Sequence, residues 1–99
     1  MSSVDFDTEL QRFLDGPSHA QQILTATASS LQSEDPFVPL TLGILNATLD
    51  GAAYVLTDGL PNIVAIEAAE QAARALPTIH PGETADAYAL RVLTIARGL

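Results

Sequence analysis

The segment Pro36–Asp58, PFVPLTLGILNATLDGAAYVLTD, is the most apolar part of the chain, and no charged side chain lies between Asp35 and Asp50. Its apolar residues recur at helical spacing along two adjacent lines, Val38, Leu42, Leu45, Leu49, Ala52 and Leu56, and Leu40, Ile44, Ala47 and Tyr54. A helix that is apolar around most of its circumference is typically buried by several neighbours. We therefore predict that Pro36–Asp58 forms the central helix of a compact bundle, with Tyr54 lining the core.

The limits of this helix are open in the sequence. Pro39 must fall in the first turn, or the helix begins only after it, because proline inside a helix removes a hydrogen bond. Asp50-Gly51 is a second weak point, since a mid-helix glycine costs about 1 kcal/mol relative to alanine. The segment 53–57 is also compatible with a short strand, but no partner strand is evident. We expect one helix, with a kink at Gly51 as the alternative.

Two further helices are predicted before this segment. In the first, residues 3–15, the apolar residues Phe6, Leu10, Phe13 and Leu14 share one face, and Gly16-Pro17 ends it. The second begins at Pro17, preceded by Asp15 or Gly16, and runs to Leu31. Its apolar stripe consists of Ala20, Ile23, Leu24, Thr27, Ala28 and Leu31.

Two more helices are predicted after the turn Asp58-Gly59. One starts after Pro61 and carries an apolar face made of Ile63, Ile66, Ala69, Ala73 and Leu76, with Ala65, Ala68, Ala72 and Ala75 beside it. On its polar face Glu70 and Arg74 are placed for an i,i+4 ion pair. The last helix runs from about Glu83 to Arg97, and Ala85, Tyr88, Ala89, Val92, Leu93 and Ala96 form its apolar face. The fold class is therefore all-α, a compact bundle of four to five helices in a single domain, 1–99.

The charge balance restricts the partners. The chain has twelve acidic residues, four arginines, no lysine and a net charge of −8. Arginine without lysine, together with abundant alanine, is the usage expected of a GC-rich bacterial or phage genome. A negative surface repels phosphate backbones and anionic lipid, so direct binding to nucleic acid or to a membrane is not expected.

The sequence also bears on the compartment. The acidic, polar start MSSVDFDTEL lacks the basic residues and the apolar run of a signal peptide. The chain contains no cysteine, so no disulfide requires an oxidising environment. The apolar segment has two prolines near its start and acidic flanks, which argues against a membrane-spanning helix. A cytoplasmic location is expected.

No pattern typical of catalysis or of a cofactor site occurs. His80 precedes Glu83 and Asp86, but these are at most three ligands without a known metal spacing. A solvated histidine beside helix-capping acids is the simpler interpretation. The acids Asp5 and Asp7 do not begin a calcium-binding loop, since the sixth position lacks glycine. No nucleophile elbow or glycine-rich phosphate loop is present. We expect no catalytic residue, cofactor or metal, and regard an enzyme as the less favoured possibility.

Protein–protein interaction is the remaining function class. The apolar residues are distributed over all the predicted helices, so a second chain could cover stripes that one chain leaves exposed. We expect a helical homodimer, or a subunit docked on a larger protein, acting as an accessory, regulatory or assembly component. The candidate contact residues are Phe6, Phe13, Ile95 and Leu99.

Two alternatives remain. In the first, Glu67 and Glu70 belong to an acidic surface that mimics DNA and occupies the basic nucleic-acid-binding site of another protein. In the second, the protein is a helical enzyme or ligand-binding domain with a pocket between helices near Tyr54, Tyr88 and His80. Against this second alternative, both tyrosines are also candidates for the hydrophobic core.

Overall fold

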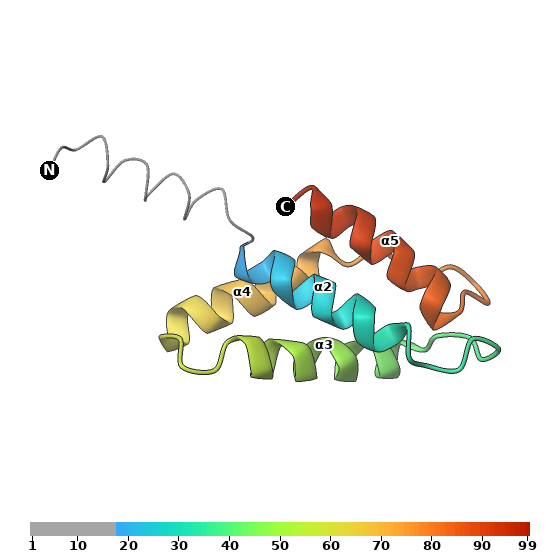
Figure 1. Ribbon diagram of the computed structural model, residues 1–99, viewed down its shortest axis with the longest axis horizontal. Coiled ribbons are helices and arrows are strands. Elements are labelled where there is room, and N and C mark those ends of the chain that lie inside the picture. The colour runs from blue at the N-terminus through green and yellow to red at the C-terminus, as the bar shows by residue number, and fades with distance from the viewer. Residues whose placement is uncertain (1–17) are drawn as a thin grey trace, which may run out of the picture.

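The computed structural model describes residues 18–99, and this part of the chain contains four α-helices (Figure 1). They are α2 (His19–Leu31), α3 (Leu42–Leu56), α4 (Asn62–Ala75) and α5 (Ala85–Arg97). The described residues form no β-strand, apart from an isolated antiparallel bridge between Pro39 and Thr84. The predicted all-helical class is confirmed for this part, while the predicted helix at residues 3–15 lies outside it.

The helix starts follow from local capping. The hydroxyl of Ser18 accepts a 3.0 Å hydrogen bond from the backbone N–H of Gln21, so Ser18 caps α2, which begins at His19. Thr41 caps α3 in the same way, with a 3.2 Å bond from the N–H of Ile44. The third helix therefore begins after Pro39, and it continues through Gly51 as one helix.

The helix α2 is the most deeply buried element of the described chain. Its predicted stripe is confirmed in full, since all six of those residues are buried. It packs against α3, α4 and α5, whereas α3 and α4 share a smaller contact with one another. The expectation that Pro36–Asp58 provides the central helix is thus not confirmed, because α2 holds that place among the described residues.

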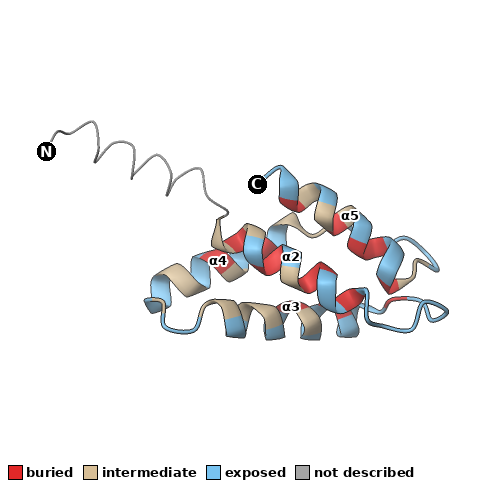
Figure 2. Cartoon of the chain, in the orientation of Figure 1, coloured by how far each residue is buried: buried red, intermediate tan, exposed pale blue. Residues whose placement is uncertain are grey.

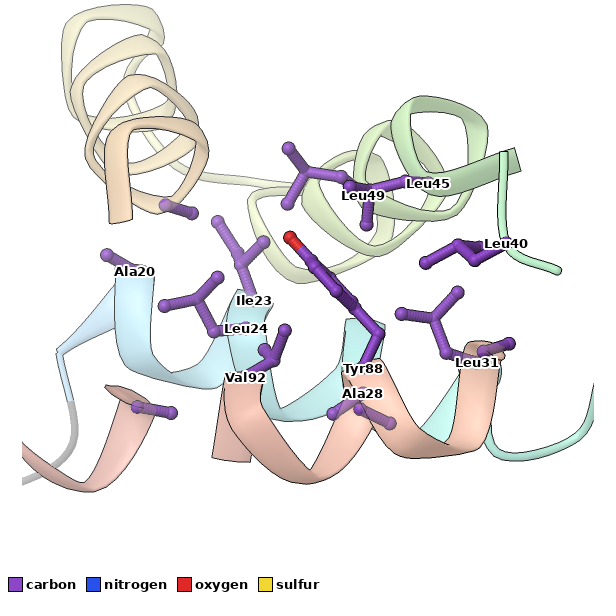
Figure 3. Close-up of a cluster of buried hydrophobic side chains, with 14 of the residues drawn as sticks. Ala20, Ile23, Leu24, Ala28, Leu31, Leu40, Leu45, Leu49, Tyr88 and Val92 are labelled. Atoms are coloured by element: carbon purple, nitrogen blue, oxygen red, sulfur yellow. The ribbon is translucent and has the colours of Figure 1, made fainter. Parts of the chain in front are cut away.

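The hydrophobic core lies around α2 and is completed by α5 (Figure 3). The α5 face is confirmed as predicted, with Tyr88 and Val92 among its fully buried residues and Leu93 partly buried. Figure 3 shows Tyr88 extending from α5 toward Leu49, with Ile23 and Leu24 of α2 alongside. The core placement predicted for Tyr88 is therefore confirmed.

The helix α3 buries only one of its two predicted apolar lines. Leu45 and Leu49 are buried and Leu56 is partly buried, because this line faces α2. Leu42, at the start of the helix, is exposed, as are Ile44 and Tyr54 of the second line. The prediction that Tyr54 lines the core is wrong, since its side chain is 82% exposed. One stripe satisfies the contact with α2, and no described element packs on the opposite side.

The face that α4 buries also differs from the prediction. Ala68 and Ala72 are buried, while Ile63 and Ile66 are 68% and 57% exposed. The side chain of alanine ends at Cβ, so an alanine face lets the backbones of α4 and α2 approach closely, whereas isoleucines would hold them apart. Hydropathy alone predicts that Ile63 and Ile66 are buried. The contact with α2 instead buries Ala68 and Ala72, because their small side chains fit between the two helices.

Candidate interaction site

The side of α3 turned away from α2 carries a strip of six residues, which we call the α3 outer face; five of them are exposed and Thr48 is half-buried. Its six residues recur at i, i+3, i+4 and i+7 spacing and are Ile44, Ala47, Thr48, Gly51, Tyr54 and Val55. Tyr54 and Val55 are 82% and 70% exposed, and Ile44 is 37% exposed. Figure 2 shows pale blue, the colour of exposed residues, along this side of α3.

The α3 outer face is apolar beyond what its residue types suggest. None of the six residues is charged, and Asp50, which lies beside them, is the single charged residue of α3. The hydroxyl of Thr48 donates a 2.8 Å hydrogen bond to the carbonyl oxygen of Ile44 in the preceding turn. Because that donor is used inside the helix, Thr48 can offer a partner its methyl group. The α3 outer face therefore has large side chains at both ends, Ile44 at one and Tyr54 and Val55 at the other, and small residues between them.

Gly51 lies in the middle of the face and leaves the helix backbone accessible. A Cβ atom built on Gly51 would have no neighbour within 4 Å, so the protein's own packing does not require glycine there. A mid-helix glycine lowers helix stability by roughly 1 kcal/mol relative to alanine. At an exposed position this loss has no compensation within the described residues. An exposed glycine inside a helix is expected where another backbone approaches closely.

A groove lies beside the first half of α3, with a volume of about 640 Å³. One wall is formed by α3, through residues that include Leu42 and Asn46, and the other by the end of α4 and the α4–α5 connector, residues 76–84. The lining is largely apolar, and Asn46, Thr78 and His80 supply its polar side chains. The size lies in the range of small-molecule sites, although the groove opens widely to solvent.

Hydrogen bonds between α5 and the α4–α5 connector fix the position of that wall. The Tyr88 hydroxyl donates to the carbonyl oxygen of Pro77 over 2.6 Å. The Arg91 guanidinium donates to the carbonyl oxygen of Thr78 over 3.1 Å and to Oε1 of Glu83 over 2.6 Å. The same Oε1 accepts the backbone N–H of His80 over 3.0 Å.

The charges of this connector network are mostly screened from water. The Glu83 side chain is 7% exposed and that of Arg91 is 32% exposed. The guanidinium carbon of Arg91 lies 5.6 Å from the centre of the Tyr88 ring, within the range of a cation–π contact. Burial raises the pKa of Tyr88 to about 12, an effect that Arg91 partly opposes and Glu83 reinforces. The network therefore stabilises a connector and does not present a reactive group.

The structure does not bring the predicted site residues together. Glu67 and Glu70 are exposed on α4, where Glu70 forms the predicted ion pair with Arg74 at 3.2 Å. Ile95 is partly buried on α5, and Leu99 is 43% exposed at the C-terminal end. Phe6 and Phe13 lie outside the described residues. The described candidates therefore lie on two separate parts of the chain, Glu67 and Glu70 on α4 and Ile95 and Leu99 at the C-terminal end.

The acids that follow His80 are occupied by local structure. Glu83 holds Arg91 and the N–H of His80, while Asp86 accepts a 2.7 Å hydrogen bond from the Thr84 hydroxyl. Within residues 18–99, no group of three or more His, Asp or Glu side chains is placed to hold a metal ion.

Sequence reasoning missed the residues of the α3 outer face as a site. Ile44, Ala47 and Tyr54 were grouped on one line, but that line was interpreted as core. The available signal was the small residue Gly51 on the same side as Ile44 and Ala47.

No protein-family model matches this chain, and no curated protein sequence or solved structure matches it. Among the described helices, none is both long enough and apolar enough to cross a membrane. The function is therefore inferred from the geometry of the site.

Proposed function

We propose that this is a small, acidic, non-enzymatic cytoplasmic protein that acts through protein–protein contact, as an accessory, regulatory or assembly component. The α3 outer face is its contact surface. The observation that carries the proposal is the exposure of Tyr54 and Val55 on a helix face that is apolar except for Asp50 at its edge. Isolated exposed apolar residues are common on soluble proteins, but a continuous apolar helix face is typical of an interaction site.

The acidic-inhibitor alternative has less support. A surface that imitates a phosphate backbone requires unpaired acids in rows, but Glu70 is paired with Arg74. Glu67 lies near Ile63 and Ile66 on α4, so apolar side chains interrupt the acidic surface.

The groove beside α3 favours a second candidate function, the binding of a small apolar ligand. Of the three residues predicted for a pocket, the structure places His80 at the groove, Tyr88 in the core and Tyr54 outside both. Titration with an apolar fluorescent probe tests this function. Binding that is lost when Ala73→Trp fills the groove supports it, and binding unchanged by that substitution counts against it.

The main proposal is tested with the protein as bait in a lysate of its source. The variant Tyr54→Asp/Val55→Asp places two charges on the α3 outer face, and Leu90→Asp is its matched control. Leu90 is an apolar residue of α5 that is 62% exposed and not part of that face. Partners retained by the wild-type protein and by the control, but lost by the double variant, support the proposal. Identical partners for all three baits contradict it.

A further inference from the structure

We propose that the α3 outer face binds an amphipathic helix of another protein, whose apolar stripe is bordered by arginine or lysine side chains. This inference rests on the proposed function and adds the chemistry of the partner. The apolar residues of the face supply the contact, and the acidic residues around it select a basic partner. Opposite charges on the two sides of an interface contribute to specificity and to the association rate.

Four exposed acidic residues surround the α3 outer face. We call them the acidic border, and they are Glu34, Asp35, Asp50 and Asp58. Asp50 is three residues after Ala47 and four before Tyr54, so it lies next to both on the helix surface. Asp58 follows the end of α3, and the other two lie in the α2–α3 loop before its start. Negative charge is therefore present at each end of the face and beside its middle.

No basic residue offsets the acidic border. The chain contains no lysine, and no arginine occurs between residues 12 and 74. In the described part of the chain, the ion pairs join Glu70 to Arg74 and Glu83 to Arg91, so neither pair includes a residue of the acidic border. Its four carboxylates are therefore available to a positively charged partner.

A pocket of about 200 Å³ continues the face near the start of α3. Ile44 belongs to both the pocket and the face. The other apolar residues of the pocket are Val38, Pro39, Leu40 and Ala85, and its charged residues are Glu34 and Asp35. Such a pocket suits a long basic side chain, because the methylene stem can lie on the apolar residues while the charged group reaches the carboxylates.

The middle of the face suits a helix. Ala47 and Gly51 lie one turn apart, and a Cβ atom built on Gly51 has no neighbour within 4 Å, so a second backbone can approach there. A helix that binds through one stripe places its contact residues at i, i+3, i+4 and i+7, the spacing that the α3 outer face itself has. An extended peptide would instead pair with the edge of a sheet, and residues 18–99 contain no β-strand.

Charge disfavours the occupants that this chain could itself provide. A second copy would bring the same acidic border and a net charge of −8. Residues 1–17 contain one arginine and four acids, so this segment is negative as well; the acids are Asp5, Asp7, Glu9 and Asp15. A basic helix from another protein is attracted where these are repelled.

Synthetic peptides test the chemistry of the partner. The basic probe is a fluorescein-labelled peptide of about 18 residues, or five helical turns, with leucine at i, i+3, i+4 and i+7 and lysine or arginine beside them. A second peptide has glutamate at every basic position, and a third has the basic composition in scrambled order. Fluorescence anisotropy should show that the basic probe binds at least roughly tenfold more tightly than either control. Equal affinities, or no binding of the basic probe, overturn the proposal.

Charge-neutral variants locate the surface that binds the probe. Glu34→Gln/Asp50→Asn removes two charges of the acidic border, and we expect the affinity for the basic probe to fall roughly fivefold. Glu67→Gln/Glu70→Gln is the matched control, because it removes two exposed charges of α4, and its effect should stay below about twofold. Circular dichroism checks that both variants keep their helices. Equal losses would show attraction to the overall charge and overturn the proposal.

The apolar contribution is measured separately. Tyr54→Ala/Val55→Ala removes the largest exposed side chains of the face without adding charge, and the affinity for the basic probe should fall roughly tenfold. Raising the salt concentration from about 0.05 to 0.5 M should weaken binding but not abolish it, because salt screens only the charges. Binding that is abolished by salt and unaffected by the alanine variant overturns the proposal.

The two proposals fail separately in the lysate comparison, where Glu34→Gln/Asp50→Asn serves as a further bait. Partners lost by this bait and by the Tyr54→Asp/Val55→Asp bait support the inference. Partners lost by the second bait but fully retained by the first exclude a basic partner and leave the α3 outer face as the contact surface. Partners retained by both baits contradict both proposals.

Discussion

The hydroxyl of Tyr88 on α5 donates a 2.6 Å hydrogen bond to the carbonyl oxygen of Pro77 in the α4–α5 connector. The Tyr88 ring is fully buried in the core, so this one residue joins the hydrophobic interior to the polar connector. The connector in turn forms a wall of the groove beside α3. The stability of α5 packing and the shape of the groove are therefore linked through Tyr88.

Replacing Tyr88 by phenylalanine tests that link. The ring remains, but the Pro77 carbonyl oxygen loses its partner, and we expect a loss of about 1 kcal/mol in the free energy of unfolding. Urea denaturation measures it. Tyr54→Phe is the matched control, because Tyr54 is exposed, and its effect should lie within about 0.5 kcal/mol of zero. Equal effects of the two substitutions would show that the hydrogen bond contributes no stability.

The raised pKa of Tyr88 predicts a loss of stability at high pH. The folded pKa of about 12 exceeds the ordinary value of 10.0, so folding favours the protonated phenol. The contribution is complete below pH 10 and is lost as the pH rises through 12. Denaturation midpoints measured between pH 9 and 12 should fall in the wild-type protein and fall less in Tyr88→Phe. Tyrosinate absorbance should show a step near pH 12 that Tyr88→Phe abolishes.

Two glutamates in the described part of the chain form ion pairs in different surroundings, and their removal should have different effects. Glu83→Ala removes the acceptor shared by Arg91 and the N–H of His80, so we expect a loss of about 2 kcal/mol. Glu70→Ala breaks an exposed pair with Arg74, whose loss should cost at most about 0.5 kcal/mol. Chemical denaturation of both variants compares them. A Glu70→Ala effect as large as that of Glu83→Ala would refute the burial argument.

Glycines at two positions should respond oppositely to alanine. Gly51 is helical and a Cβ there meets nothing within 4 Å, so Gly51→Ala should stabilise the monomer by roughly 0.5–1 kcal/mol. Gly59 has a φ of +83°, which disfavours a side chain, so Gly59→Ala should destabilise it by about 1 kcal/mol. Thermal unfolding measures both. The same sign for both would contradict the conformational argument.

The sequence predicted the elements better than their arrangement. The stripes of α2 and α5 identified their buried faces because each contains one apolar line with polar residues opposite. The two apolar lines of α3 were both assigned to the core, since hydropathy shows which side chains avoid water but not whether one chain can cover them. Tyr54 is the clearest example. The bond between Tyr88 and Pro77 joins residues on different elements, and no local pattern predicts such a contact.

The alanines of α4 allow a test of how closely this helix packs on the core, because hydropathy alone predicts that Ile63 and Ile66 are more deeply buried than the alanines. Ala72 is fully buried in the core, whereas its neighbour Ala73 is exposed at the groove. Ala72→Leu adds three carbons where no space exists, so it should cost about 1–3 kcal/mol and loosen the packing of α4. Ala73→Leu adds the same atoms toward solvent and should change stability by less than about 0.5 kcal/mol. Urea denaturation compares the two, and near-equal losses would show that α4 does not approach the core as closely as the structure indicates.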